Sequence, residues 1–109
     1  MLKVSKSKLS ATEEKIAKKA LQKAYKREIS ALMNDVRDRA NSLNKIENLW
    51  YLQDLLSTKR YEIDGKYVYN FYSIVFDFAK LINENWLTIE DFQGLSSEML
   101  SKISALTRI

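Results

Sequence analysis

The sequence SATEEKIAKKALQKAYKREISALMNDVRDRANSL, residues 10–43, decides the fold. Ser10 followed by Glu13 is the pattern of a capping box, so a helix is expected to begin near Ala11. No Pro or Gly interrupts the chain before Asn41. Apolar residues recur mostly at steps of three or four, which is a helical stripe: Ile16, Leu21, Tyr25, Ile29, Leu32, Val36, Ala40 and Leu43.

The length of this helix is its most informative property. About 30 residues make a helix about 45 Å long. A compact domain of about 100 residues is only about 30 Å across. We therefore expect the helix to extend beyond its own domain and to pack against a second chain.

A second helix is expected directly after the first. Asn44 and Glu47 form an Asn-x-x-Glu start, and leucines continue the helical spacing as far as Ile63. Gly65 suits the left-handed position that follows a helix end. Because the connection at 41–45 is short, the two helices should be antiparallel neighbours.

The rest of the chain is rich in aromatic residues, and its spacing also favours helices. Residues 67–85 are expected to form a helix, because Val68, Phe71, Tyr72, Val75 and Phe78 follow helical steps. Thr88 and Asp91 open a short helical turn that Gly94 closes, and Ser96 caps a last helix.

We therefore predict an all-α fold, a long antiparallel helical hairpin plus a small helical head, dimerising through the long helices. The predicted segments are a flexible basic tail at 1–9, the dimerising hairpin at 10–64 and a compact, aromatic-rich head at 65–109.

Composition argues against an enzyme. The 109 residues include neither Cys nor His, which removes disulfides, zinc sites of the usual kind and His-based acid–base catalysis. Glu62 and Asp64 are close in sequence, but without a pocket signature such a pair is typical of a solvated helix end. No Gly-rich loop or metal-loop spacing appears. We expect no catalytic residue, no metal and no cofactor.

The charge is concentrated at the N-terminal end. Residues 1–27 carry nine Lys or Arg and two Glu, whereas the net charge of the whole chain is only +4. This basic stretch is either a solvated helix face or a site for an anionic surface. No helix-turn-helix or RNA-binding signature accompanies it, so nucleic acid is not the expected partner. No apolar run is long enough for a signal peptide or a membrane span, and we expect a soluble intracellular protein.

The second helix carries Trp50, Asp54 and Arg60 beside its leucine stripe. Trp50 and Asp54 share a face as an i, i+4 pair, whereas Arg60 is offset by roughly a quarter turn or more. Asp54 and Arg60 are therefore poorly placed to pair within one helix, but they could meet across a two-fold axis. The alternative is a half-buried Trp with an extended Arg and a surface Asp around it. Trp and Arg are enriched where protein interfaces bind most strongly, which favours an interface.

Three stretches resemble the fluorescence recovery protein family of cyanobacteria: KAYKRE at 23–28, NLWYLQDLLSTKRYEIDGKY at 48–67 and SKISALTRI at 101–109. The resemblance extends from about Leu21 to Ile109. It implies an all-helical homodimer, formed through the long helices, that binds the photoactivated orange carotenoid protein, mainly at its C-terminal domain. Such a protein speeds the return of its partner to the closed resting form and its release from the phycobilisome, and it needs no cofactor.

The resemblance also implies roles for single residues. A functional patch is expected at Trp50, Gln53, Asp54, Arg60, Phe76 and Lys102. The dimer interface is expected at Met33, Leu32, Val36, Leu49, Trp50, Asp54 and Arg60. One departure is Gln53, where a family member carries His; because Gln does not titrate near neutral pH, no pH-dependent role is expected there.

Two other functions stay open at this point, a purely structural helical dimer and a basic adaptor for an anionic surface or nucleic acid. The expected location is cytoplasmic, with a peripheral position at the cytoplasmic face of the thylakoid as an alternative.

Overall fold

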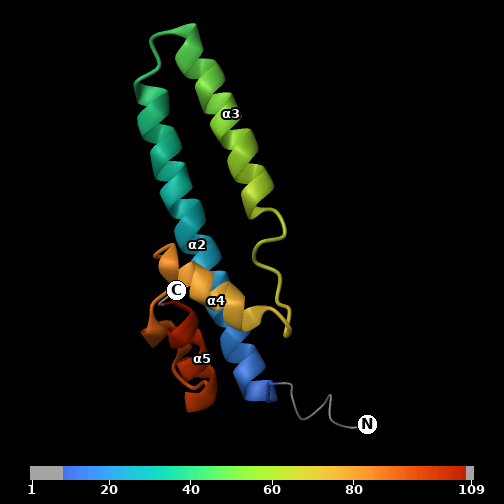
Figure 1. The fold of residues 1–109 in the computed structure, drawn as a ribbon. Coiled ribbons are helices and arrows are strands. Elements are labelled where there is room, and N and C mark those ends of the chain that lie inside the picture. The colour runs from blue at the N-terminus through green and yellow to red at the C-terminus, as the bar shows by residue number, and fades with distance from the viewer. Residues whose placement is uncertain (1–8, 108–109) are drawn as a thin grey trace.

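The computed structural model describes residues 9–107, and its fold is all-helical (Figure 1). The elements are α2 (Ala11–Asn41), α3 (Ile46–Ile63), α4 (Ile74–Asn83), the 3₁₀-helix η1 (Ile89–Phe92) and α5 (Ser97–Thr107). Residues 9–107 contain no strand. The all-α prediction is confirmed. The division into tail, hairpin and head stays a prediction, and most of the predicted tail lies outside the described residues.

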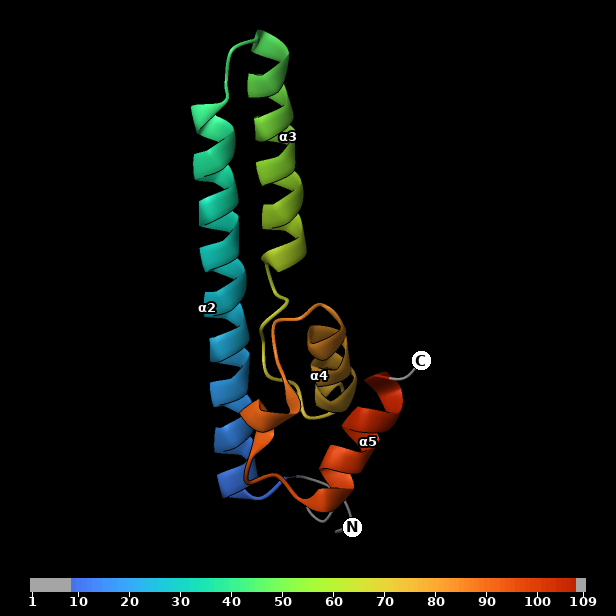
Figure 2. The ribbon, with the colours of Figure 1, turned by 90° about the vertical axis from the view of Figure 1, so that its left-hand side faces the viewer.

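Helix α2 is the spine of the molecule. The side chain of Ser10 accepts a hydrogen bond from the Glu13 amide at 3.1 Å, and the Glu13 carboxylate accepts one from the Ser10 amide at 3.3 Å. This is the predicted capping box. The helix then continues for 31 residues. The molecule measures 61 × 27 × 25 Å, and the far ends of α2 and α3 extend well beyond the head (Figures 1 and 2).

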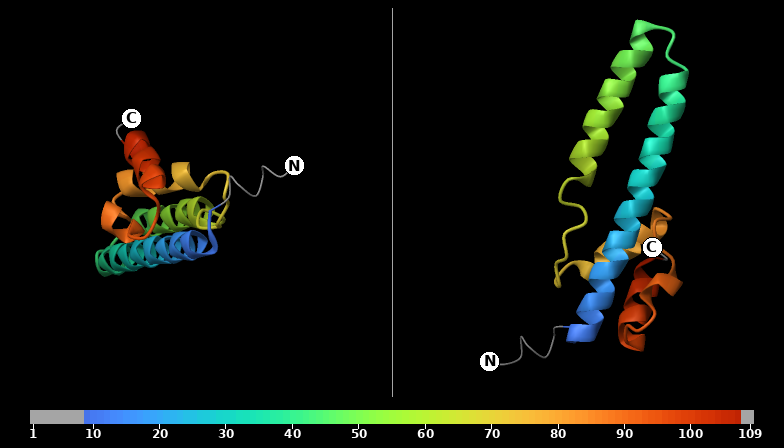
Figure 3. Two further views of the ribbon diagram at one scale, coloured as in Figure 1. Left: turned by 90° about the horizontal axis from the view of Figure 1, so that it is seen from below. Right: turned by 180° about the vertical axis from the view of Figure 1, so that it is seen from behind.

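Helix α3 returns antiparallel to α2 (Figure 3). Its start differs from the prediction, because Lys45 is the N-cap and makes no side-chain capping bond. The Asn44 side chain instead accepts a hydrogen bond from the side chain of Asn48 at 3.0 Å. The helix begins one residue too late for Asn44 to cap it. Its end is as predicted: α3 stops at Ile63, and Gly65 has a positive φ of 79°.

The prediction of a helix over 67–85 is wrong for its first third. Residues 64–73 form turns and an extended linker, and helix begins only at Ile74. Asn70 explains the break: its side chain accepts a hydrogen bond from the Tyr72 amide at 2.9 Å, and its carbonyl accepts one from the Ser73 amide at 3.1 Å. Such local bonds compete with helix formation. Tyr67 and Tyr69 are partly buried while Val68 and Asn70 are exposed, which is the alternation of extended chain.

The core lies between the N-terminal half of α2 and residues 74–103. Three alanines of α2 let the head approach the helix closely, and Phe78 and Phe92 fill the space with ring centroids 4.5 Å apart. The buried core residues are Ala17, Ala20, Leu21, Ala24, Ile74, Phe78, Ala79, Leu81, Leu87, Phe92, Leu95 and Ile103. The C-terminal half of α2 contributes nothing to this core.

Two predicted turns tie the head to the start of α2. Thr88 and Asp91 form a capping box around η1, and Ser96 accepts a hydrogen bond from the Met99 amide at 3.2 Å. The Ser96 amide donates to Glu13 at 2.9 Å, which joins α5 to the first turn of α2. Gly94 has a φ of 103°, and a Cβ there would lie 2.5 Å from the Ile16 side chain. The positive φ therefore favours glycine at this position, and any larger residue would also have to displace the end of the Ile16 side chain.

Candidate functional site

Helix α3 has no buried residue in 18 positions. Trp50 is 54% exposed, and Leu49 and Leu56 are also exposed. A helix in a folded protein normally buries one apolar stripe. Here Leu52, Leu55 and Ile63 are only partly buried, and the exposed apolar surface beside them is typical of an interaction surface.

Part of this face is hollowed into a groove of about 500 Å³, called here the α3 groove. It is lined by Leu49, Trp50, Leu52, Gln53, Leu56, Ser57 and Arg60. The structure thus brings together three of the predicted patch residues, Trp50, Gln53 and Arg60. The groove offers apolar surface, one amide and one guanidinium, which suit binding of another protein surface.

The charges at the groove differ from the helical-wheel expectation, because Arg60 and not Asp54 lines the groove with Trp50. Asp54 is exposed on the same helix but does not line the groove. Arg60 reaches Asp64, one turn later, at 3.8 Å. Because both of these side chains are largely exposed, the pair contributes little to stability. Arg60 and Asp54 both remain accessible to a partner.

The predicted interface residues of α2 lie beside α3. Met33 is 53% exposed, whereas Leu32 and Val36 are partly buried. Leu32 lines a small cavity of about 240 Å³ between the two helices, together with Lys59, Ile63 and Trp86. The α2–α3 pair is therefore incompletely filled where the hairpin meets the head.

Phe76 and Lys102 lie away from the α3 groove, on α4 and α5 of the head. The Phe76 side chain is 65% exposed. Lys102 forms an exposed pair with Glu98 at 3.6 Å. The predicted patch is therefore spread over two surfaces, one on α3 and one on the head.

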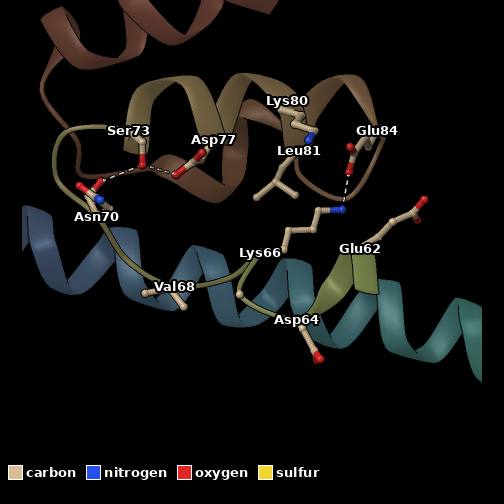
Figure 4. A pocket seen from close by; sticks show the side chains of 11 residues that line it. Glu62, Asp64, Lys66, Val68, Asn70, Ser73, Asp77, Lys80, Leu81 and Glu84 are labelled. Carbon is tan, nitrogen blue, oxygen red and sulfur yellow. Dashed lines mark hydrogen bonds and ion pairs between the residues drawn. The ribbon is translucent and has the colours of Figure 1, made fainter. Parts of the chain in front are cut away.

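A buried ionic cluster, which the sequence analysis missed, joins the linker to both sides of the molecule. We call it the Lys66 clasp: Lys66 donates to Glu28 of α2 at 2.9 Å and to Glu84 at 2.7 Å, and Tyr67 also donates to Glu28. Figure 4 shows the Lys66–Glu84 contact across the polar pocket between the linker and α4. Glu28 shares the arc of Ala17 and Ala24 on the wheel. A charge on that apolar arc was a signal that a partner was required.

The hydrogen bonds of the Lys66 clasp shift the pKa values of Glu28, Lys66 and Tyr67. Burial alone would raise the pKa of Glu28, but hydrogen bonds from Tyr67 and Lys66 outweigh it and hold that pKa below the usual 4.5. Burial would lower the pKa of Lys66, yet its bonds to Glu84 and Glu28 raise it. Burial and the Glu28 bond raise the pKa of the Tyr67 hydroxyl. Glu28 and Lys66 are thus both charged at neutral pH.

A second ion pair holds η1 against α2. Arg27 donates to Asp91 at 2.8 and 3.2 Å and to the Trp86 carbonyl at 2.9 Å. The Arg27 bond is the main cause that lowers the pKa of Asp91. Together with the clasp, this fork fixes the head on α2 and so fixes where Phe76 lies relative to the spine.

Two kinds of site are missing from the part of the chain that the structure describes. Within residues 9–107, no group of three or more acidic side chains is placed to hold a metal ion. Nor does any helix in that range have the length and apolar character needed to cross a membrane.

Comparison with known proteins decides the family. A sequence model described as "Photoprotection regulator fluorescence recovery protein" matches residues 9–107. The chain belongs to the fluorescence recovery protein family. It is 38% identical to the fluorescence recovery protein of Synechocystis sp. over 109 residues, which is 100% of both chains.

Solved structures of this family have the same fold. The fluorescence recovery protein of Fremyella diplosiphon matches with a TM-score of 0.86 and 48% identity, covering 92% of this chain and 98% of that one. The Synechocystis structure matches with a TM-score of 0.88 and 40% identity, covering 93% and 99%. This chain is therefore a member of a family of photoprotection regulators.

Removing the cation of the clasp should loosen the head. Lys66→Met keeps the length of the side chain but leaves Glu28 buried without this cation. We expect a loss of about 2–3 kcal/mol of unfolding free energy, below the roughly 3–5 kcal/mol of a fully buried pair, because Lys66 is partly exposed and Tyr67 still donates to Glu28. Urea unfolding measures it. The matched control is Lys80→Met, because Lys80 is exposed on α4. A loss no larger for Lys66→Met than for Lys80→Met would contradict the role of the clasp.

Acid should destabilise the fold through the same carboxylates. Folding lowers the pKa of Glu28, Glu13 and Asp91, so the unfolded chain binds protons more tightly than the folded one. Their stabilisation is complete above the unfolded pKa and is lost as the pH falls through the folded pKa. The melting temperature should therefore drop between about pH 5 and about pH 3. This drop in melting temperature should be smaller in Lys66→Met than in the wild-type protein. An equal drop in the two proteins would exclude Glu28 as a cause of the acid sensitivity.

Proposed function

We propose that this protein binds the photoactivated orange carotenoid protein and accelerates its return to the closed resting form. Membership of a photoprotection family named for fluorescence recovery supports this proposal. The observation that carries it is structural: α3 has 18 residues and none is buried. We infer that other protein surfaces cover the exposed apolar residues of α3 when the protein is bound to its partners.

The first of these surfaces is a second copy of the chain. Leu49, Trp50 and Leu56 of α3 and Met33 of α2 are all exposed in one protomer. Fully burying one large apolar side chain contributes about 1.5–3 kcal/mol, and roughly half of that is available for each of these half-exposed side chains. A few such residues on each copy therefore supply what a stable dimer requires, with Leu32 and Val36 beside them. Each copy covers the stripe that the other leaves in water.

The charged edge of α3 then gives the dimer its geometry. Asp54 of one copy and Arg60 of the other meet across the two-fold axis, since within one helix Arg60 reaches only Asp64. A charge pair removed from water fixes orientation more than it stabilises, because desolvation offsets most of the attraction. Trp50 and Gln53 lie between these charges and extend the interface into the functional patch.

The second surface is on the head and faces the carotenoid protein. Phe76 supplies an exposed aromatic anchor on α4, and Lys102 supplies a cation on α5. Aromatic rings such as Phe76 are enriched at protein interfaces, and the Lys102 ammonium can pair with a carboxylate of the partner. The head holds the C-terminal domain of the partner, and the protruding α2–α3 hairpin guides the other domain back.

Acceleration by this route needs no catalytic residue and no cofactor. The protein has only to bind the closing geometry more tightly than the open one. Each tenfold increase in rate takes about 1.4 kcal/mol of such preference. The closed form leaves the phycobilisome, so antenna fluorescence recovers. The site of action is the cytoplasm, at the thylakoid-attached antenna on its cytoplasmic face.

The dimer is tested by placing a charge in its interface. Met33→Glu should shift the protein to monomer, because the dimer would bury an unpaired carboxylate. Light scattering measures the mass. Tyr72→Glu is the matched control, since Tyr72 is an exposed ring on the linker, outside the proposed interface. An unchanged mass for folded Met33→Glu would remove Met33 from the interface.

The function is tested by dark recovery of the illuminated orange carotenoid protein, followed by its carotenoid absorbance. The wild-type chain should speed recovery, and Arg60→Leu should lose about tenfold of that acceleration, equivalent to about 1.4 kcal/mol. Arg37→Leu is the control, because Arg37 is exposed and bonds only to Asn34 among the described contacts. An unchanged rate with saturating wild-type protein would refute the function. Full activity of folded Arg60→Leu would refute only the role of Arg60.

A further inference from the structure

The basic residues of the N-terminal half of α2 divide into two groups with different tasks. Lys23 and Arg27 point toward the head, where Asp91 lies 3.9 Å from Lys23 and 2.8 Å from Arg27. The others lie on one arc of about 100°, turned away from the buried alanines. They are Lys15, Lys18, Lys19 and Lys26.

The outward group is weakly compensated. Lys18 pairs with Glu14 at 2.8 Å, in an exposed i, i+4 pair. Within residues 9–107, no acidic oxygen lies within 4.0 Å of Lys15, Lys19 or Lys26, and all three are exposed. The surface therefore carries a net positive charge that the fold itself does not use.

A groove of about 540 Å³ runs beside this basic arc, and we call it the tyrosine groove. It is lined by Lys18, Leu21, Gln22, Tyr25, Lys26, Tyr67 and Tyr69. Tyr25 packs edge-on against Tyr67 with centroids 5.5 Å apart, and the Lys18 ammonium lies 5.4 Å from the ring centre of Tyr69. Tyr67 and Tyr69 of the linker thus form the tyrosine groove together with α2, and Lys18 and Lys26 lie toward its two ends.

We propose that the tyrosine groove binds an acidic amphipathic segment of the partner protein. The occupant presents an apolar or aromatic side chain to the tyrosines and a carboxylate to each flanking lysine. Lys18 and Lys26 are eight residues apart, or about 12 Å along the helix. Two carboxylates seven or eight residues apart on a partner helix match that spacing. This inference rests on the proposed function and adds a second contact to it, separate from Phe76 and Lys102.

The structure favours a protein segment over the other anionic occupants. A helix that lies on a membrane inserts its apolar face, but here the apolar face of α2 is covered by the head, with Ala17 and Ala24 fully buried. Nucleic acid is bound by cations that follow a phosphate backbone. Here the cations flank a short groove whose floor is Leu21 and tyrosine rings, which suits an apolar anchor between two carboxylates.

Position 22 can test the proposal with a charge of either sign. Gln22 is exposed, lines the groove and makes no side-chain hydrogen bond among the described contacts. Gln22→Lys should bind the illuminated orange carotenoid protein several-fold more tightly at low salt, and Gln22→Glu several-fold more weakly. The difference should shrink at high salt, since exposed charges are screened. Gln93→Lys and Gln93→Glu carry the same charge changes at the exposed end of η1 and should bind like wild type.

A photo-crosslinker at position 22 then identifies the occupant. Attachment to a partner segment with carboxylates at the stated spacing supports the proposal. Equal affinities of the two Gln22 variants, while wild type still binds, would refute the groove and leave the proposed function intact. Absence of binding by wild type would refute the proposed function itself. Crosslinking to a second copy of this chain, or a Gln22 effect confined to phosphatidylglycerol vesicles or duplex DNA, would overturn the acidic protein segment as occupant.

Discussion

The structure depends on one constraint, the mismatch between a 31-residue helix and the small head that covers only its first half. Ala17, Ala20 and Ala24 let the head sit close to α2, whereas the second half of the helix is only partly covered, with Leu32 partly buried and Met33 exposed. Its antiparallel companion α3 supplies only partial cover, because Leu52, Leu55 and Ile63 are partly buried and no residue of α3 is fully buried. An apolar surface therefore remains on the hairpin, and a second chain is the simplest way to remove it from water.

Electrostatics sets the position of the head on this spine. The Lys66 clasp and the Arg27–Asp91 fork both anchor to consecutive residues of α2, Arg27 and Glu28. They hold the linker on one side of the helix and η1 on the other. Because both are partly buried and fully bonded, they restrict the head to one orientation more than they add stability. The exposed Phe76 is consequently presented in a fixed direction relative to the hairpin.

The sequence predicted those parts whose cause is local. The capping boxes at Ser10 and Thr88, the glycine after α3 and the long stripe of α2 depend on residues within a few positions of each other. It failed at 67–73, where the aromatic spacing mimics a helix but Asn70 turns the chain and both Tyr67 and Tyr69 pack toward α2. It also missed the clasp, whose members Glu28, Lys66 and Glu84 are brought together only by the tertiary fold.

The residues of the candidate site also differ in how far the sequence alone could predict them. Trp50, Asp54 and Arg60 could be singled out from the helical wheel, but the wheel sets Arg60 off from Trp50, and only the structure brings those two to one groove with Gln53. Phe76 and Lys102 could be named only through the family resemblance, since their exposure depends on how α4 and α5 pack.

The basic residues near the N-terminal end have two different roles that composition alone cannot separate. Nine cations near the N-terminal end look alike in sequence. In the structure, Lys23 and Arg27 are held by Asp91 and serve the fold, whereas Lys19 and Lys26 face water beside the tyrosine groove. Only the second kind is available to attract a partner, and its contribution falls with ionic strength because it stays exposed.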